Sequence, residues 1–195
     1  MSIRTDMATE SFSQAGGAEK LQGVKVKNKV IENARLEVTD ITIETQEAAE
    51  KLGRPVGRYI TLTATDSTFD MYSDSFRERA EVIAKAIKEL CGGCERFLAV
   101  GLGNYALTSD AVGPLTAEKI FATRHIKSLA KEIDTDDLGE VTVIQTGVLG
   151  NTGIESSEQV KAIAERVTPQ AVIAVDALAC SELSNLGRTI QLCDT

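Results

Sequence analysis

Two segments in the first third of the chain alternate apolar and polar side chains. The alternation over residues 36–44 is interrupted only at Asp40, and the alternation over 59–65 is unbroken. A period of two is typical of strands with one wetter face, so both segments are predicted to be strands. Between them, residues 46–52 are predicted to form a short helix that stops at Gly53.

The most clearly patterned helix is predicted to follow Ser75. Ser75 and Glu78 stand in the spacing of a capping box, in which each side chain satisfies a backbone amide of the first turn. Gly92 suits the left-handed residue that ends many helices. Its buried stripe is predicted to consist of five residues: Phe76, Ala80, Ile83, Ile87 and Leu90.

Three short, continuous apolar runs follow, at residues 97–100, 141–144 and 171–175. Such runs are typical of strands buried on both faces. Helices are predicted between them, one over about 114–123 and one that opens with a second capping box at Thr152–Glu155, and a last strand begins at Ile190. This alternation of helices and strands predicts an α/β fold, with a mostly parallel sheet and helices on both of its faces.

The N-terminal region differs from the rest of the chain. Residues 1–29 are polar, contain glycine and show no sustained period, so they are predicted to be flexible or loosely docked. Residues 30–195 are predicted to form a single α/β domain, which suits a chain of 195 residues.

Composition narrows the possible partners. The formal net charge of −8 argues against a nucleic-acid surface, which normally carries a basic stripe, but leaves basic protein partners open. No apolar run approaches the roughly 20 residues that span a membrane, and the N-terminus has no signal-peptide core. The default expectation is a cytoplasmic protein without a membrane segment.

Cys91 and Cys94 form a C-x-x-C pair, the form of a redox or zinc half-site. Zinc needs further ligands, and the chain has one histidine, His125. The pair is therefore interpreted as two cysteines in a turn that ends a helix.

Two aspartates follow predicted parallel strands and are the main candidates for chemistry. Asp176 directly follows the strand 171–175, and Asp110 lies in the loop after the strand 97–100. The carboxyl ends of parallel strands share one edge, where ligands bind, so the two carboxylates can converge. A close pair can supply a general base and a general acid for amide hydrolysis. The residues alone favour a structural role, in which each aspartate caps a turn or a helix.

Other signals near this edge are weaker. The segment Gly101–Ala106 fits the dinucleotide pattern G-x-G-x-x-A, but a loop separates it from the next predicted helix, whereas the pattern needs a helix to open at once. Asn104 is a candidate donor to an oxyanion or a turn residue. His125 is a candidate base, although a lone histidine near a helix end is more often structural.

Several motifs together resemble the germination protease (spore protease) family, and the resemblance covers nearly the whole chain in order. The motifs are Arg4–Ala8, Gly57–Leu62, Gly101–Asn104, Thr108–Pro114, Thr123–His125, Thr146–Glu155 and Ala174–Ala179. The Cys91 and Cys94 pair is not part of the resemblance.

The resemblance implies an atypical aspartic endopeptidase that uses no metal or other cofactor, with Asp110 and Asp176 as its catalytic aspartates. It implies a zymogen that removes a short propeptide, residues 1–6, by cleaving its own Asp6–Met7 bond. It also implies a homotetramer that degrades small acid-soluble spore proteins in the spore core during germination.

The implied fold is similar to that of the hydrogenase maturation endopeptidases. The resemblance further implies that the family continues past the position of Thr195, so the chain is expected to be truncated at its C-terminal side. Two alternatives remain at this stage: a metal-dependent maturation peptidase of the same fold, and a module that binds a dinucleotide or another small ligand at Gly101–Ala106.

Overall fold

A computed structural model describes residues 5–16, 22–129 and 138–195. The chain divides into two compact units, and each is described by itself. The first contains Met1–Gly92 together with Leu178–Thr195, and the second contains Gly93–Ala177. Residues 178–195 therefore belong to the first unit and not to the second. The reason is that the C-terminal residues pair with strands near the N-terminus, which a pass along the chain does not reveal.

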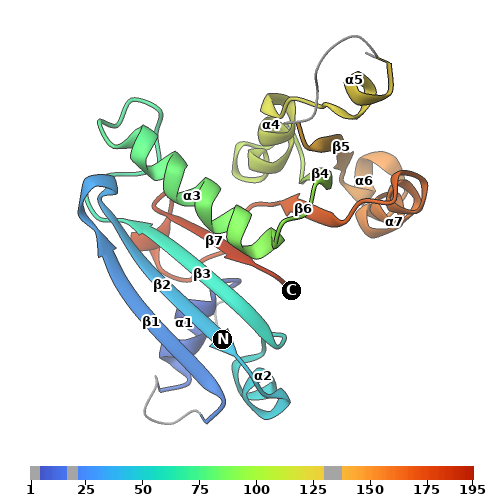
Figure 1. The fold of residues 1–195 in the computed structure, drawn as a ribbon. Helices are drawn as coiled ribbons and strands as arrows, with labels where there is room; N and C mark the ends of the chain where they lie inside the picture. Colours follow the sequence, from blue (N-terminus) through green and yellow to red (C-terminus); the bar gives the residue numbers. More distant parts are fainter. Residues whose placement is uncertain (1–4, 17–21, 130–137) are drawn as a thin grey trace. The chain divides into compact units, whose positions relative to one another are not determined.

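The first unit contains an antiparallel sheet of four strands (Figure 1). In spatial order these strands are β1 (Val24–Ile31), β2 (Leu36–Ile43), β3 (Gly57–Ala64) and β7 (Thr189–Cys193). The predicted strands are confirmed in position. Their antiparallel pairing was not predicted, because helix–strand alternation holds only in the second half of the chain.

Helices cover both faces of this sheet (Figure 1). Helices α1 (Ala8–Gln14) and α2 (Gln46–Leu52) pack on one face, against Ile41, Ile43 and Tyr59. Helix α3 (Phe76–Cys91) packs on the other face, against Val38, Ile60 and Leu62. The two sets of strand residues point to opposite faces because their positions alternate along each strand.

Helix α3 begins after Ser75 as predicted, but without the predicted capping box. The Ser75 side chain makes no capping hydrogen bond, and its hydroxyl lies 3.0 Å from that of Ser73. The most buried residue of α3 is charged: Arg79 is 2% exposed, pairs with Asp66 and donates to the carbonyl oxygen of Ala34. A binary apolar–polar pattern cannot identify such a position.

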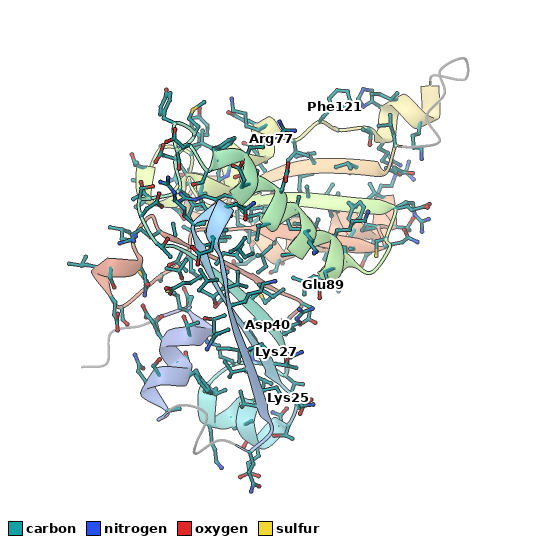
Figure 2. The ribbon with its side chains drawn as sticks, turned by 60° about the vertical axis from the view of Figure 1, so that its left-hand side comes forward. Lys25, Lys27, Asp40, Arg77, Glu89 and Phe121 are labelled. Carbon is teal, nitrogen blue, oxygen red and sulfur yellow. The ribbon has the colours of Figure 1, made fainter. Side chains whose placement is uncertain are left out.

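Helix α1 and strand β1 lie within residues 1–29, which were predicted to be flexible or loosely docked. The sequence showed no sign of either element, because α1 is too short to show a helical period and β1 is an edge strand whose side chains are largely exposed. Lys25 and Lys27 project from β1 (Figure 2), and Lys25 forms an ion pair with Glu44 at 2.5 Å. Charged side chains on an edge strand discourage pairing with other molecules.

The second unit contains the predicted parallel sheet. Its strands, in spatial order, are β5 (Glu140–Gly147), β4 (Arg96–Leu102) and β6 (Ala171–Val175). Its helices are α4 (Val112–Lys119), α5 (Arg124–Leu129), α6 (Leu149–Thr152) and α7 (Ser156–Val167). The α/β class is therefore confirmed. The capping box of α7 is formed by Glu155 and Glu158, one turn after the predicted start at Thr152.

Short 3-10 helices complete the elements: η2 (Glu32–Ala34), η3 (Thr108–Asp110) and η4 (Leu183–Asn185). Within the described ranges, no helix is both long enough and apolar enough to cross a membrane.

Candidate active site

Asp110 ends η3, in the loop that follows the central strand β4 of the parallel sheet. Its half-buried carboxylate accepts a hydrogen bond from the backbone N–H of Asn104, with an N–Oδ2 distance of 2.8 Å. The same N–H also points to the carbonyl oxygen of Asp110, at 3.1 Å. The loop between residues 104 and 110 is therefore closed on itself, and this fixes Asp110 beside the end of β4.

Glycines allow this loop to lie close against the strand ends. A side chain on Gly103, whose φ is +113°, would overlap the backbone and the carboxylate of Asp110. A side chain on Gly113, at the start of α4, would overlap the carbonyl oxygens of Leu102 and Val175. Gly113 therefore joins the ends of β4 and β6 through direct backbone contact.

Asp176 directly follows β6, the strand whose last residue, Val175, contacts Gly113. Strand β6 pairs in parallel with β4, and Val175 lies opposite Gly101. The exposed carboxylate of Asp176 accepts a hydrogen bond of 2.8 Å from the N–H of Ala177. Asp110 and Asp176 thus lie at the same carboxyl edge of adjacent strands, which are about 4.8 Å apart in a sheet. An arrangement of this kind suits two carboxylates that act on one substrate bond.

The remaining predicted supporting residues lie in different places. Asn104 lies at the carboxyl edge beside Asp110. His125 is exposed on α5, two residues after Thr123. Thr123 bonds to Gly139 and Val141, at the amino end of β5. The structure therefore brings Asn104 to Asp110 and places His125 near the opposite edge of the sheet.

A pocket of about 260 Å³ adjoins Asp110 at this edge. Its walls include Gly103 and Asn104, which both contact Asp110, and also Tyr105, Gln145 and Asn151. The sequence reasoning missed these three residues. The signal that could have found Gln145 is the one that found Asp176, namely a polar side chain at the carboxyl end of a parallel strand.

The described residues at this edge form neither a metal site nor a dinucleotide-binding site. Within the described ranges, no group of three or more His, Cys, Asp or Glu side chains is arranged to hold a metal ion. The segment Gly101–Ala106 does not open a helix, because η3 intervenes and α4 begins only at Val112. Its amides therefore lack the helical arrangement that a dinucleotide pyrophosphate needs.

The Asp6–Met7 bond belongs to the first unit and is held on both sides. The N–H of Asp6 donates to the carbonyl oxygen of Ala179 at 2.8 Å, and the carbonyl oxygen of Asp6 accepts from Gln191 at 3.1 Å. Met7 is only 2% exposed. The bond predicted to be cleaved is therefore anchored in a defined conformation.

The close packing at Gly113 leads to a stability prediction. We expect Gly113→Ala to lower the free energy of unfolding by about 1–3 kcal/mol, because the added methyl group meets backbone atoms that cannot rotate away. Chemical denaturation of the two proteins measures the difference. Gly150→Ala is the matched control, since a methyl group there meets nothing within 4 Å. Equal stability of the Gly113 and Gly150 variants would contradict the packing described here.

Comparison with known proteins places the chain in a family. The family model described as "Germination protease" matches residues 3–195. Germination proteases of Clostridium perfringens and Clostridium tetani are 36% and 35% identical to the chain, over 99% and 100% of its length. That of Priestia megaterium is 33% identical over 100% of it. The chain spans 60%, 61% and 55% of the lengths of these three relatives. The chain belongs to the germination protease family.

Proposed function

We propose that the protein is an aspartic-type endopeptidase that starts the degradation of small acid-soluble spore proteins during germination. The observation that supports this most is the position of Asp110 and Asp176 at one edge of the parallel sheet, in a chain that matches the family over residues 3–195. Under this proposal the enzyme acts in the spore core, as a homotetramer, without a metal or other cofactor.

The proposed mechanism divides acid and base roles between the two aspartates. The ionised carboxylate takes a proton from a water molecule, whose oxygen attacks the peptide carbonyl carbon. The protonated carboxyl group then gives its proton to the leaving amine as the C–N bond breaks. The mechanism needs one carboxyl group in each state, one as the base and one as the acid. Asn104, beside Asp110, is placed to donate to the developing oxyanion through its side-chain amide.

A direct assay tests the function. Incubation of the native protein with a purified small acid-soluble spore protein is expected to give discrete fragments by mass spectrometry. A chelator is expected to leave the rate unchanged, because the proposed water activation uses carboxylates alone. Loss of cleavage on chelation, with recovery on addition of a divalent metal, would instead support a metal-dependent maturation peptidase.

We further propose that Asp6–Met7 is the bond cleaved when a zymogen matures. Asp6 is acidic and Met7 is apolar. The backbone of Asp6 donates one hydrogen bond to Ala179 and accepts another from Gln191. N-terminal sequencing of matured protein is expected to read Met7-Ala8-Thr9. A mature N-terminus far from Met7 would contradict the assignment, and Asp6→Ala is expected to slow maturation more than Asp70→Ala, a change in an exposed turn.

A further inference from the structure

The pocket beside Asp110 contains side-chain amides whose hydrogen-bonding groups are partly committed to the protein. We propose that it binds a primary carboxamide of the substrate, a glutamine or asparagine side chain, and that Gln145 is the residue that selects it. This inference rests on the proposed peptidase function and adds a specificity determinant to it.

Gln145 is oriented by its hydrogen bond to helix α4. Its Nε2 donates to the carbonyl oxygen of Pro114 over 3.1 Å, and Pro114 is itself buried in the wall of the pocket. Oε1 of Gln145 accepts no hydrogen bond from any described residue. With the donor end of the amide engaged, the group left for a ligand is an acceptor.

Asn104 presents the complementary group. Its Oδ1 accepts from the N–H of Ala106 at 3.0 Å, and its Nδ2 carries two hydrogens, one for the proposed oxyanion and one left as a donor to a ligand. Asn151, whose side chain bonds to none of the described residues, adds an amide that can turn either way. The pocket therefore offers one oriented acceptor and one oriented donor, which together match the NH₂ and C=O of a carboxamide.

The lining also disfavours charged ligands. None of its residues carries a formal charge. A carboxylate in the pocket would face the acceptor of Gln145 and lie near Asp110, and an ammonium group would face the donor of Asn104. A neutral carboxamide satisfies both oriented groups and fits within about 260 Å³.

Binding tests the inference without catalysis. The probes are N-acetyl-glutamine methylamide and its glutamate and norleucine counterparts, at millimolar concentration, and the readout is the side-chain amide NMR signals of Asn104 and Asn151. We expect the glutamine probe to shift both signals and the other two probes to leave them in place. Gln145→Met is expected to abolish the shifts. The matched control is Gln159→Met, because Gln159 also donates to a backbone carbonyl, that of Ile154 at 3.2 Å, but does not line the pocket.

Cleavage tests the same inference in the enzyme. For peptide pairs that differ by glutamine against norleucine at one position near the cleaved bond, we expect kcat/KM to favour glutamine at one such position. Gln145→Met is expected to reduce that preference by about threefold to tenfold, the effect of one hydrogen bond between neutral groups. Gln159→Met is expected to preserve it.

The two assays separate the possible failures. Amide shifts without cleavage of any peptide would reject the peptidase proposal and leave the carboxamide pocket standing. Absence of shifts with the glutamine probe, equal shifts with the glutamate probe, or shifts that survive Gln145→Met would reject the pocket assignment.

Discussion

Replacement of Asp110 or Asp176 by asparagine is expected to lower the rate of peptide-bond cleavage by about 10²–10⁴-fold, the range that a positioned acid or base contributes. Asparagine keeps an oxygen that can accept the N–H of Asn104 at position 110 or of Ala177 at position 176. It can neither take a proton from water nor return one to the amine. The variants should therefore lose activity but keep the fold. The assay compares each variant with the native protein, with a small acid-soluble spore protein as the substrate.

The control for these variants is an aspartate with the same local role elsewhere. Oδ1 of Asp70 accepts the N–H of Tyr72 at 2.9 Å in an exposed turn of the first unit. Asp70→Asn is expected to retain both activity and melting temperature. Unchanged cleavage by either active-site variant would reject the acid–base mechanism, and a large fall in melting temperature would show that the aspartate is structural.

Local patterns were sufficient to locate the parallel sheet and its two aspartates. The apolar runs at 97–100, 141–144 and 171–175 are strands β4, β5 and β6, but only β4 is buried on both faces as predicted; β5 is largely half-buried, and β6 alternates half-buried and exposed residues. The position of Asp110 and Asp176 at one edge then follows from parallel pairing, because the carboxyl ends of parallel strands lie together.

Features that depend on distant pairing could not be predicted in the same way. Strand β7 pairs with β3, more than a hundred residues earlier, and nothing in residues 189–193 specifies that partner. The overlap between Gly113 and the carbonyl oxygen of Val175 depends equally on the finished fold. The pocket at Gln145 was not predicted, because an isolated neutral polar residue at a strand end indicates a functional site less strongly than an aspartate does.

The role of Glu10 also could not be predicted from the sequence. Its replacement is expected to have a large effect on stability. It is only 7% exposed, and its carboxylate accepts hydrogen bonds from Ser181 and Asn185. These bonds attach helix α1, which follows the Asp6–Met7 bond, to residues 181–185. We expect Glu10→Gln to lower the free energy of unfolding by about 3 kcal/mol, because it places an NH₂ group against donors and removes a charge that several of them share.

The acid dependence of this effect gives an independent check. Burial alone would raise the pKa of Glu10, but hydrogen bonds from Ser181, Thr5 and Asn185 outweigh it and lower the pKa from 4.5 to about 2. Because the folded pKa is the lower one, the stabilisation is complete above pH 4.5 and is lost as the pH falls towards 2. The stability difference between the native protein and Glu10→Gln should therefore shrink over that range.

The stability difference between the native protein and Glu10→Gln has to be measured, because other carboxylates also take up protons in acid. A hydrogen bond from Arg35, with a further one from Arg79, lowers the pKa of Asp66, which therefore adds its own acid sensitivity to both proteins. Glu47→Gln is the matched control: Glu47 is exposed and pairs with Lys51 on one helix, a surface contact that contributes little to stability. A Glu10→Gln effect as small as the control, or one that does not vary between pH 4.5 and 2, would show that Glu10 does not hold α1 in place. Helix α1 would then have to be retained by its apolar contacts and by its other hydrogen bonds, from the N–H of Ala8 to Gln191 and from Arg54 to Ser11.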